Sequence, residues 1–385
     1  MAGSNTNRFE YIDALRGWAI FGVILTHAAS LVGIGGLSAK VAAFGGYGVQ
    51  LFFVVSGFTI FLVYQKGFAA QKHPAANFFT RRLFRIVPIY WAGIVLYSAV
   101  YGMDSRGWQP GPELWHIPLH VLLINLLHPA ATSSVVPGGW SISCEVLFYL
   151  TVPLWVALIR STRAALVFCV AAMVAAPILI QVMRMCMGDW VDTFGAQEAG
   201  RYYYRSLFSQ LACFAFGILM YFLVCQPARW LEQLKQWRWN LLLCATAATV
   251  FVVGALHLVP FPRAHHLYAA SFMLLGVALS QVPWKLLVNR AVIYLGRISY
   301  SAYLVHFLVL KQLSLVVDQG GWSKAAYFGV IASVGFAFTV VLASISFRWI
   351  EQPFQNMAGR IVKRRENSAS RAGASDPAQS SSSPG

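Results

Sequence analysis

Apolar stretches of about 20 residues recur along the whole chain, and this length matches the hydrocarbon thickness of a bilayer. Of the 385 residues, 58% are hydrophobic and only 11% are charged, whereas about 25% are charged in a typical soluble domain. In lipid, all backbone polar groups must be paired within the protein, and runs of this length favour helices. The sequence therefore predicts an all-α integral membrane protein with about ten transmembrane helices. The expected spans are 11–33, 44–64, 86–102, 140–160, 164–184, 204–225, 240–259, 267–282, 291–316 and 324–349.

The chain is strongly basic, with 29 Lys and Arg residues against 13 Asp and Glu, a formal net charge of +16. If the N-terminus is cytoplasmic, most of these cations fall in segments on the inner side of the membrane, as the positive-inside rule requires. Membrane orientation therefore explains the charge, and no nucleic acid is expected as a partner. Both termini are expected in the cytoplasm.

Three segments depart from the pattern of spans. Residues 114–128 are too short for a full crossing and are interpreted as a re-entrant or interfacial helix. His116 and His120 in this segment have the i, i+4 spacing of zinc ligands, but no further ligand is evident nearby and no metal is expected. His265 and His266 are interpreted as solvated surface. Residues 356–385 are predicted to form a basic and then disordered Ser/Gly-rich cytoplasmic tail that follows one membrane domain over 1–355.

The first expected span carries both Arg16 and His27. Eleven residues close about three helical turns, so both side chains share one face and are separated by about 16 Å along the axis. An arginine at the centre of a membrane helix costs about 2.5–3.5 kcal/mol on insertion scales. Because chains rarely carry this cost without a use, the pair is the best pointer to function.

Further polar residues fall at two depths of the expected spans. Arg82 and Arg85 share a face just before the third span and, with the arginine of the first span, form an inner layer of cations. Glu145 and His306 are expected in the outer half, at the depth of the histidine of the first span. An arginine cluster can hold a polyanion, an imidazole can accept a proton from a hydroxyl, and a carboxylate can orient the imidazole. This layering fits transfer of a group from a phosphate-bearing donor below to a hydroxyl acceptor above.

Each of these features also has a plainer interpretation. Arg16 could snorkel or pair with Asp13, which is compatible with a role in binding a donor. His27 and His306 could be satisfied core histidines, and the arginines before the third span could be an ordinary positive-inside cluster. At the level of function, the alternatives are a transporter or flippase of a glycolipid or small solute, and a non-enzymatic membrane scaffold.

Several segments together resemble the acyltransferase family 3 membrane proteins, which acylate cell-surface glycans and some secreted small molecules. The order of the motifs is that of the family, from residue 11 to residue 353, although 160–290 match only in hydropathy. One departure is Cys144, where a second carboxylate is common. The matching segments are Asp13-Ala14-Leu15-Arg16-Gly17 with His27, Gly48-Val49 through Phe52-Phe53 to Ser56-Gly57-Phe58, Arg82-Leu83-Phe84-Arg85-Ile86 with Pro88-Ile89-Tyr90-Trp91, Gly138-Gly139-Trp140-Ser141-Ile142 through Glu145 to Phe148-Tyr149 and Pro153, Ser299-Tyr300 to Tyr303-Leu304 and His306, and Glu351-Gln352-Pro353.

The resemblance implies acyl-CoA, usually acetyl-CoA, as the cytoplasmic donor. It implies a hydroxyl acceptor on a cell-surface polysaccharide, a lipid-linked saccharide or a secondary metabolite, and a multi-pass protein of the bacterial inner membrane. His27 is then a general base or, in the competing mechanism, the carrier of an acyl-histidine intermediate. The expected catalytic residues are His27, Glu145 and His306. The expected donor-binding residues are Arg16, Arg82 and Arg85.

Overall fold

The computed structural model describes residues 9–106, 111–226 and 229–374, and every regular element within these ranges is a helix. The predicted all-α class is therefore confirmed. The helices are α1 (Glu10–Val32), α2 (Gly36–Phe44), α3 (Gly48–Ala70), α4 (Pro74–Tyr101), α5 (His116–Val121), α6 (Gly139–Leu158), α7 (Thr162–Asp192), α8 (Ala196–Arg205), α9 (Leu207–Cys225), α10 (Arg229–Gln233), α11 (Trp237–Ala255), α12 (Ala264–Gln281), α13 (Arg290–Arg297), α14 (Ser299–Val316), α15 (Lys324–Ser346) and α16 (Gln352–Ala374).

Eight helices within the described ranges are long and apolar enough to cross a membrane, or nine if α13 and α14 together form one broken span. The chain is thus a multi-span membrane protein, close to the ten spans expected. The remaining predicted span, 267–282, falls within α12 except for its last residue. This helix is 18 residues long and carries His265 and His266 in its first turn, and it is not among the helices apolar enough to cross a membrane.

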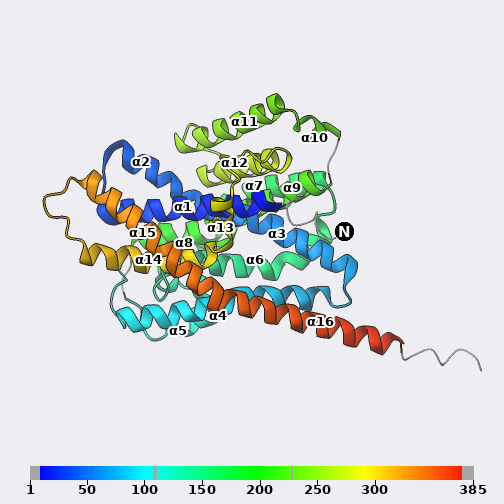
Figure 1. Cartoon of the computed structure of the whole chain (residues 1–385), viewed down its shortest axis with the longest axis horizontal. Helices are drawn as coiled ribbons and strands as arrows, with labels where there is room; N and C mark the ends of the chain where they lie inside the picture. The colour runs from blue at the N-terminus through cyan, green and yellow to red at the C-terminus, as the bar shows by residue number, and fades with distance from the viewer. Residues whose placement is uncertain (1–8, 107–110, 227–228, 375–385) are drawn as a thin grey trace, which may run out of the picture.

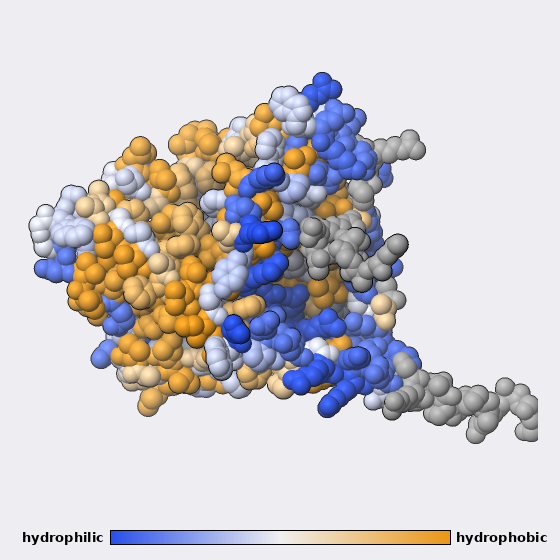
Figure 2. Space-filling model, viewed as in Figure 1, coloured by the Kyte–Doolittle hydropathy of each residue, from blue (hydrophilic) through white to orange (hydrophobic). Residues whose placement is uncertain are grey.

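The long helices run side by side in one general direction, and α1 begins at the same end of the bundle where α16 finishes (Figure 1). Hydrophilic residues gather at this end, whereas apolar residues cover much of the rest of the visible face (Figure 2). If both termini lie on one side of the membrane, α1 must begin at the end of the bundle where α16 finishes, and this arrangement is observed (Figure 1).

The span expected over 291–316 is not one straight helix. The chain bends by 79° between α13 and α14, and the reason is a close contact between α13 and α1. A Cβ added at Gly296 would lie 1.7 Å from the carbonyl oxygen of Asp13, and one added at Gly17 would lie 2.2 Å from that of Val292. The two backbones therefore touch, and only glycine permits this crossing.

We expect Gly296→Ala to destabilise the protein, because the added methyl group would force α13 away from α1. Overpacking of this kind typically costs about 1–3 kcal/mol. The measurement is the melting temperature of the purified protein in detergent. Gly329→Ala in α15 is the matched control, since a Cβ there meets no atom within 4 Å. Equal melting temperatures for the two variants would contradict the proposed backbone contact.

Two further expectations are corrected by the structure. The tail expected over 356–385, basic and then disordered, is helical as far as Ala374, because α16 spans Gln352–Ala374; 375–385 lie outside the described residues. Glu366 anchors this helix by accepting hydrogen bonds from the backbone N–H groups of Lys72 and His73, at 2.8 and 3.1 Å, and from Asn77 Nδ2 at 2.7 Å.

The two adjacent histidines of α12 are not at the solvated surface. His265 and His266 are 4% and 0% exposed, and the Nε2 atom of each lies 3.1 Å from the carbonyl oxygen of Ser209. Because a carbonyl can only accept, Nε2 is the donor in each contact. These residues join α12 to α9, and their burial could not be inferred from two polar residues at a helix start.

The segment 114–128 forms the short helix α5 and a 3₁₀ turn at Asn125–Leu127, followed by another at Pro129–Ala131. His120 in α5 is fully buried, its Nδ1 lying 2.8 Å from the Tyr90 hydroxyl and its Nε2 2.7 Å from the carbonyl oxygen of Ala131. Burial lowers the pKa of His120 to about 3, so the ring is neutral. Within the described residues, no group of three or more His, Cys, Asp or Glu side chains could hold a metal ion.

Candidate active site

Two cavities lie one after the other along the bundle. The inner cavity, of about 630 Å³, is lined by Arg16 in the first half of α1 and by residues of α3, α4, α6 and α14. The outer cavity, of about 1030 Å³, is lined by His27 in the second half of α1. Since α1 starts at the end of the bundle where α16 finishes (Figure 1), the inner cavity is the one closer to that end. Arg16 and His27 thus reach separate but consecutive cavities from one helix.

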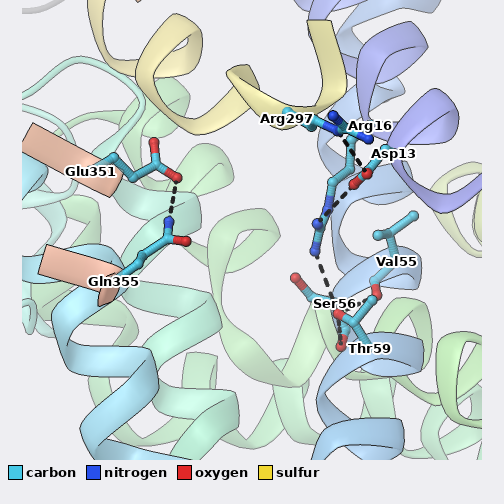
Figure 3. A network of polar contacts seen from close by, with 8 residues as sticks. All are labelled: Asp13, Arg16, Val55, Ser56, Thr59, Arg297, Glu351 and Gln355. Atoms are coloured by element: carbon cyan, nitrogen blue, oxygen red, sulfur yellow. Dashed lines mark hydrogen bonds and ion pairs between the residues drawn. The ribbon is translucent and has the colours of Figure 1, made fainter. Parts of the chain in front are cut away.

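Arg16 is held at the wall of the inner cavity by a polar network (Figure 3). Its guanidinium lies 3.7 Å from the carboxylate of Asp13 and 3.5 Å from the Thr59 hydroxyl. Arg297 Nε lies 3.7 Å from the second carboxylate oxygen of Asp13. The local pairing with Asp13 therefore exists, and Arg16 lines the cavity as well.

Arg82 and Arg85 enter the inner cavity from α4. Arg82 is buried, and its guanidinium lies 5.8 Å from the ring centre of Tyr149 and 5.6 Å from that of Phe78. Both arginines also line a third cavity of about 630 Å³, beside Gln355 at the start of α16. The arginine wall therefore continues from the inner cavity toward α16, as a path for a long anionic molecule would require.

Glu145 lies in the inner cavity with these arginines and does not line the outer cavity, where His27 is found. Its carboxylate accepts hydrogen bonds from the hydroxyls of Ser56 and, at 2.6 Å, Tyr149. The structure therefore brings Glu145 together with the arginines, where one carboxylate offsets part of their charge. The sequence suggested instead that Glu145 orients His27.

The structure brings His27 and His306 together. Their ring centres are 5.3 Å apart, and Phe307 lies 4.3 Å from the ring of His27. Nδ1 of His306 lies 2.7 Å from the carbonyl oxygen of Tyr303. Because that oxygen only accepts, Nδ1 carries the proton. Nε2 of His306 is then a buried acceptor, and it has no hydrogen-bond partner among the described residues.

Tyr303 and Val49 line both cavities and form the partition between them. The Tyr303 hydroxyl lies 2.9 Å from the Ser141 hydroxyl and donates to the carbonyl oxygen of Gly138 at 3.2 Å. Gly138 has φ +78°, and a Cβ there would lie 2.9 Å from the Tyr303 hydroxyl oxygen. Glycine thus allows the start of α6 to approach the phenol.

The sequence profile of a family described as Acyltransferase domain matches residues 9–349, nearly the whole helical bundle. This chain belongs to that acyltransferase family. The resemblance seen in the motifs is confirmed. The two consecutive cavities therefore belong to a membrane-embedded acyltransferase.

Three bacterial proteins are similar to this acyltransferase in sequence. It is 24% identical to the acyltransferase MdmB of Streptomyces mycarofaciens, over 92% of this chain and 93% of the relative. It is 22% identical to the O-acetyltransferase OatA of Staphylococcus aureus, over 89% of this chain and 57% of the relative. A shorter match, 31% identical, covers 27% of this chain and 32% of the exopolysaccharide production protein ExoZ of Rhizobium meliloti. No solved structure matches the acyltransferase.

Other residues at the site of this acyltransferase were not assigned a role from the sequence. Glu351 ends a π-helical turn over Phe347–Glu351, a form of helix often found at functional sites. It is 2% exposed and accepts hydrogen bonds from Ser301 at 2.9 Å and Gln355 at 3.0 Å. Its carboxylate points toward the side on which Arg16 lies (Figure 3). The motif Glu351-Gln352-Pro353 was a signal for this residue.

Three arginines of the outer cavity were also overlooked. Arg106, Arg201 and Arg205 line it together with His27. In the sequence they are ordinary cations of segments expected on the outer side. Only the folded structure brings the segment that ends at Arg106 and the helix that carries Arg201 and Arg205 to the same cavity.

Proposed function

We propose that this acyltransferase is a multi-pass protein of the bacterial inner membrane that moves an acyl group, acetyl in the simplest case, from cytoplasmic acyl-CoA to a hydroxyl of a surface glycan. The observation that carries the proposal is the pair of consecutive cavities, with arginines in one and His27 in the other, separated by Tyr303 and Val49. Each substrate would have its own cavity, and the reacting atoms would meet at the partition.

The arginine wall supports a CoA thioester as the donor. Arg82 and Arg85 continue from the inner cavity to the cavity beside α16, and guanidinium groups bind phosphates through paired, charge-assisted hydrogen bonds. The phosphates would bind there while the pantetheine arm passes Arg16 toward the partition. The excess of cations at this end supports its cytoplasmic orientation.

The chemistry requires one proton transfer and one exchange of bonds. His27 accepts the proton of the acceptor hydroxyl, whose oxygen attacks the thioester carbonyl. A C–O bond forms and the C–S bond breaks, and the CoA thiolate leaves and takes up the proton. His306 lies beside His27 and would position it, while Glu145 offsets charge among the arginines of the donor cavity.

A glycan acceptor is supported by the names of two relatives, an O-acetyltransferase and an exopolysaccharide production protein. The aromatic residues Trp140, Tyr204 and Phe307 of the outer cavity suit the faces of sugar rings. Acceptor and donor would approach from opposite sides of the membrane.

The proposal is tested by comparing the surface glycans of wild-type and deletion strains by mass spectrometry. We expect the deletion strain to lack one acyl increment. The purified protein in nanodiscs should then release thiol from acetyl-CoA when glycan extracted from the deletion strain is added, and the glycan should gain the missing mass. A transporter would instead move a solute without consuming acetyl-CoA. Glycans of identical mass in both strains, with no thiol release, would contradict the proposed function.

A further inference from the structure

The outer cavity has a second chemical property that the transfer reaction does not require. We infer that it binds an anionic acceptor, a saccharide that carries a phosphate or carboxylate close to the hydroxyl that becomes acylated. This inference rests on the proposed O-acyltransferase function and names the class of its acceptor.

Two guanidinium groups of the outer cavity bind only neutral oxygen atoms within the described part of the chain. Arg106 is 1% exposed and donates to the backbone carbonyls of Asp104 and, at 2.9 Å, Gly102. Its Nε has no hydrogen-bond partner among the described residues. Arg205 donates to the Thr132 hydroxyl at 2.7 Å.

The charge of the outer cavity is poorly balanced. Arg201 forms an ion pair with Glu198, which also interacts electrostatically with Arg205, as Asp104 does with Arg106. Among the described residues that line the cavity, however, none is Asp or Glu. Arginines held in a partly desolvated cavity need an anion or a solvent-filled space. The Ser133 hydroxyl also lines the cavity and has no hydrogen-bond partner among the described residues. It is a further donor suited to an oxyanion.

The inner cavity provides a useful comparison. Its three arginines share the space with Glu145, and Arg16 has Asp13 beside it. Both cavities are thus cationic, and the outer one has the weaker compensation. An anion bound at the outer arginines would therefore occupy a different cavity from the phosphates of the donor.

The position of the arginines also fits the reaction. They line the same cavity as His27, so an anion bound to them would hold the rest of the acceptor beside the general base. Arg205 lies 5.9 Å from the ring centre of Trp140, and Trp140 lies 6.1 Å from Tyr204. The charged site thus adjoins an aromatic wall on which a sugar ring can pack.

The test measures binding by calorimetry to the full protein in nanodiscs, with three probes. One is a short polyprenyl-diphosphate disaccharide, one is a disaccharide with a single glucuronate, and one is the matching neutral disaccharide. We expect at least one anionic probe to bind about tenfold or more tightly than the neutral probe, because hydrogen bonds to charged groups are the stronger ones. A preference for the diphosphate alone identifies a lipid-linked acceptor, and a preference for the glucuronate alone identifies an acidic glycan.

Two variants test the residues in opposite directions. Arg205→Gln should remove most of the preference for the anionic probe, whereas Arg263→Gln, at an exposed site outside the cavity, should leave it unchanged. Glu198→Gln should tighten anion binding, since it releases Arg201 from its ion pair. A misfolded variant cannot bind more tightly, so this gain separates the proposed role from general damage.

The inference is overturned if all three probes bind equally or none binds, or if Arg205→Gln and Glu198→Gln leave the preference unchanged. Failure of the proposed function is distinguishable from these results. It would appear as an absence of thiol release from acetyl-CoA with the deletion-strain glycan, while the preference for anions is intact.

Discussion

Replacing His27 with alanine should lower the rate of acyl transfer by about 10²–10⁴-fold, the usual contribution of a positioned general base. Donor binding should be unchanged, because His27 lines the outer cavity and the arginines of the donor site line the inner one. The measurement is thiol release from acetyl-CoA with acceptor glycan, together with the dissociation constant of a non-hydrolysable acetyl-CoA analogue. His257→Asn, an exposed histidine far along the chain in the α11–α12 connection, is the control and should retain full activity.

A near-normal rate for His27→Ala would contradict the assignment. The same preparation distinguishes the two mechanisms for this residue. With a general base, rapid quenching of wild-type protein and radiolabelled acetyl-CoA before acceptor is added should leave no label on the protein. Labelled protein that is absent in His27→Ala would establish an acyl-histidine intermediate instead.

Replacing Arg85 with alanine should weaken donor binding by about ten- to a hundredfold, since a hydrogen bond to a charged group contributes about 1.5–3 kcal/mol. Arg85 lines both the inner cavity and the cavity beside α16, so its loss removes a phosphate contact midway along the proposed path. The Michaelis constant for acetyl-CoA should rise, and kcat at saturating donor should change little. This pattern is the reverse of that expected for the outer histidine.

Arg160→Ala provides the matched control for the loss of one cation near the same end of the bundle. Arg160 is exposed and donates from Nε to the carbonyl oxygen of Ala157. The Arg160→Ala substitution removes one positive charge, as Arg85→Ala does, but Arg160 does not line the inner or the outer cavity. An equal rise in the Michaelis constant in both variants would show that the effect comes from general surface charge and would contradict a phosphate site at Arg85.

The helical class and most of the spans could be predicted from hydropathy, because lipid leaves the backbone few alternatives to helix. The break between α13 and α14 could not. It depends on the approach of Gly296 to the backbone of Asp13, which is almost 300 residues away in the sequence. A contact of this kind leaves no trace in the hydropathy of the segment itself.

The residues that line the two cavities could be predicted from the sequence to different degrees. Arg16 and His27 lie on one helix, so helical geometry alone predicts that they share a face and differ in depth. Glu145 comes from another helix, α6, whose rotation about its axis the sequence does not define. Its hydrogen bond with Tyr149 lies within α6, four residues along. Its pairing with Ser56 of α3, and its place in the inner cavity and not the outer one, follow from how α6 packs on α3.

The partition of Val49 and Tyr303 has an electrical consequence. With water in both cavities, the voltage drop inside the protein would be concentrated at these side chains, whereas in the surrounding lipid it is spread over roughly 30 Å of hydrocarbon. Moving one elementary charge through 100 mV changes its energy by about 2.3 kcal/mol. Protons and thiolates that form beside the partition would sense much of this field, so the turnover of the protein would depend on how strongly the cell energises its membrane.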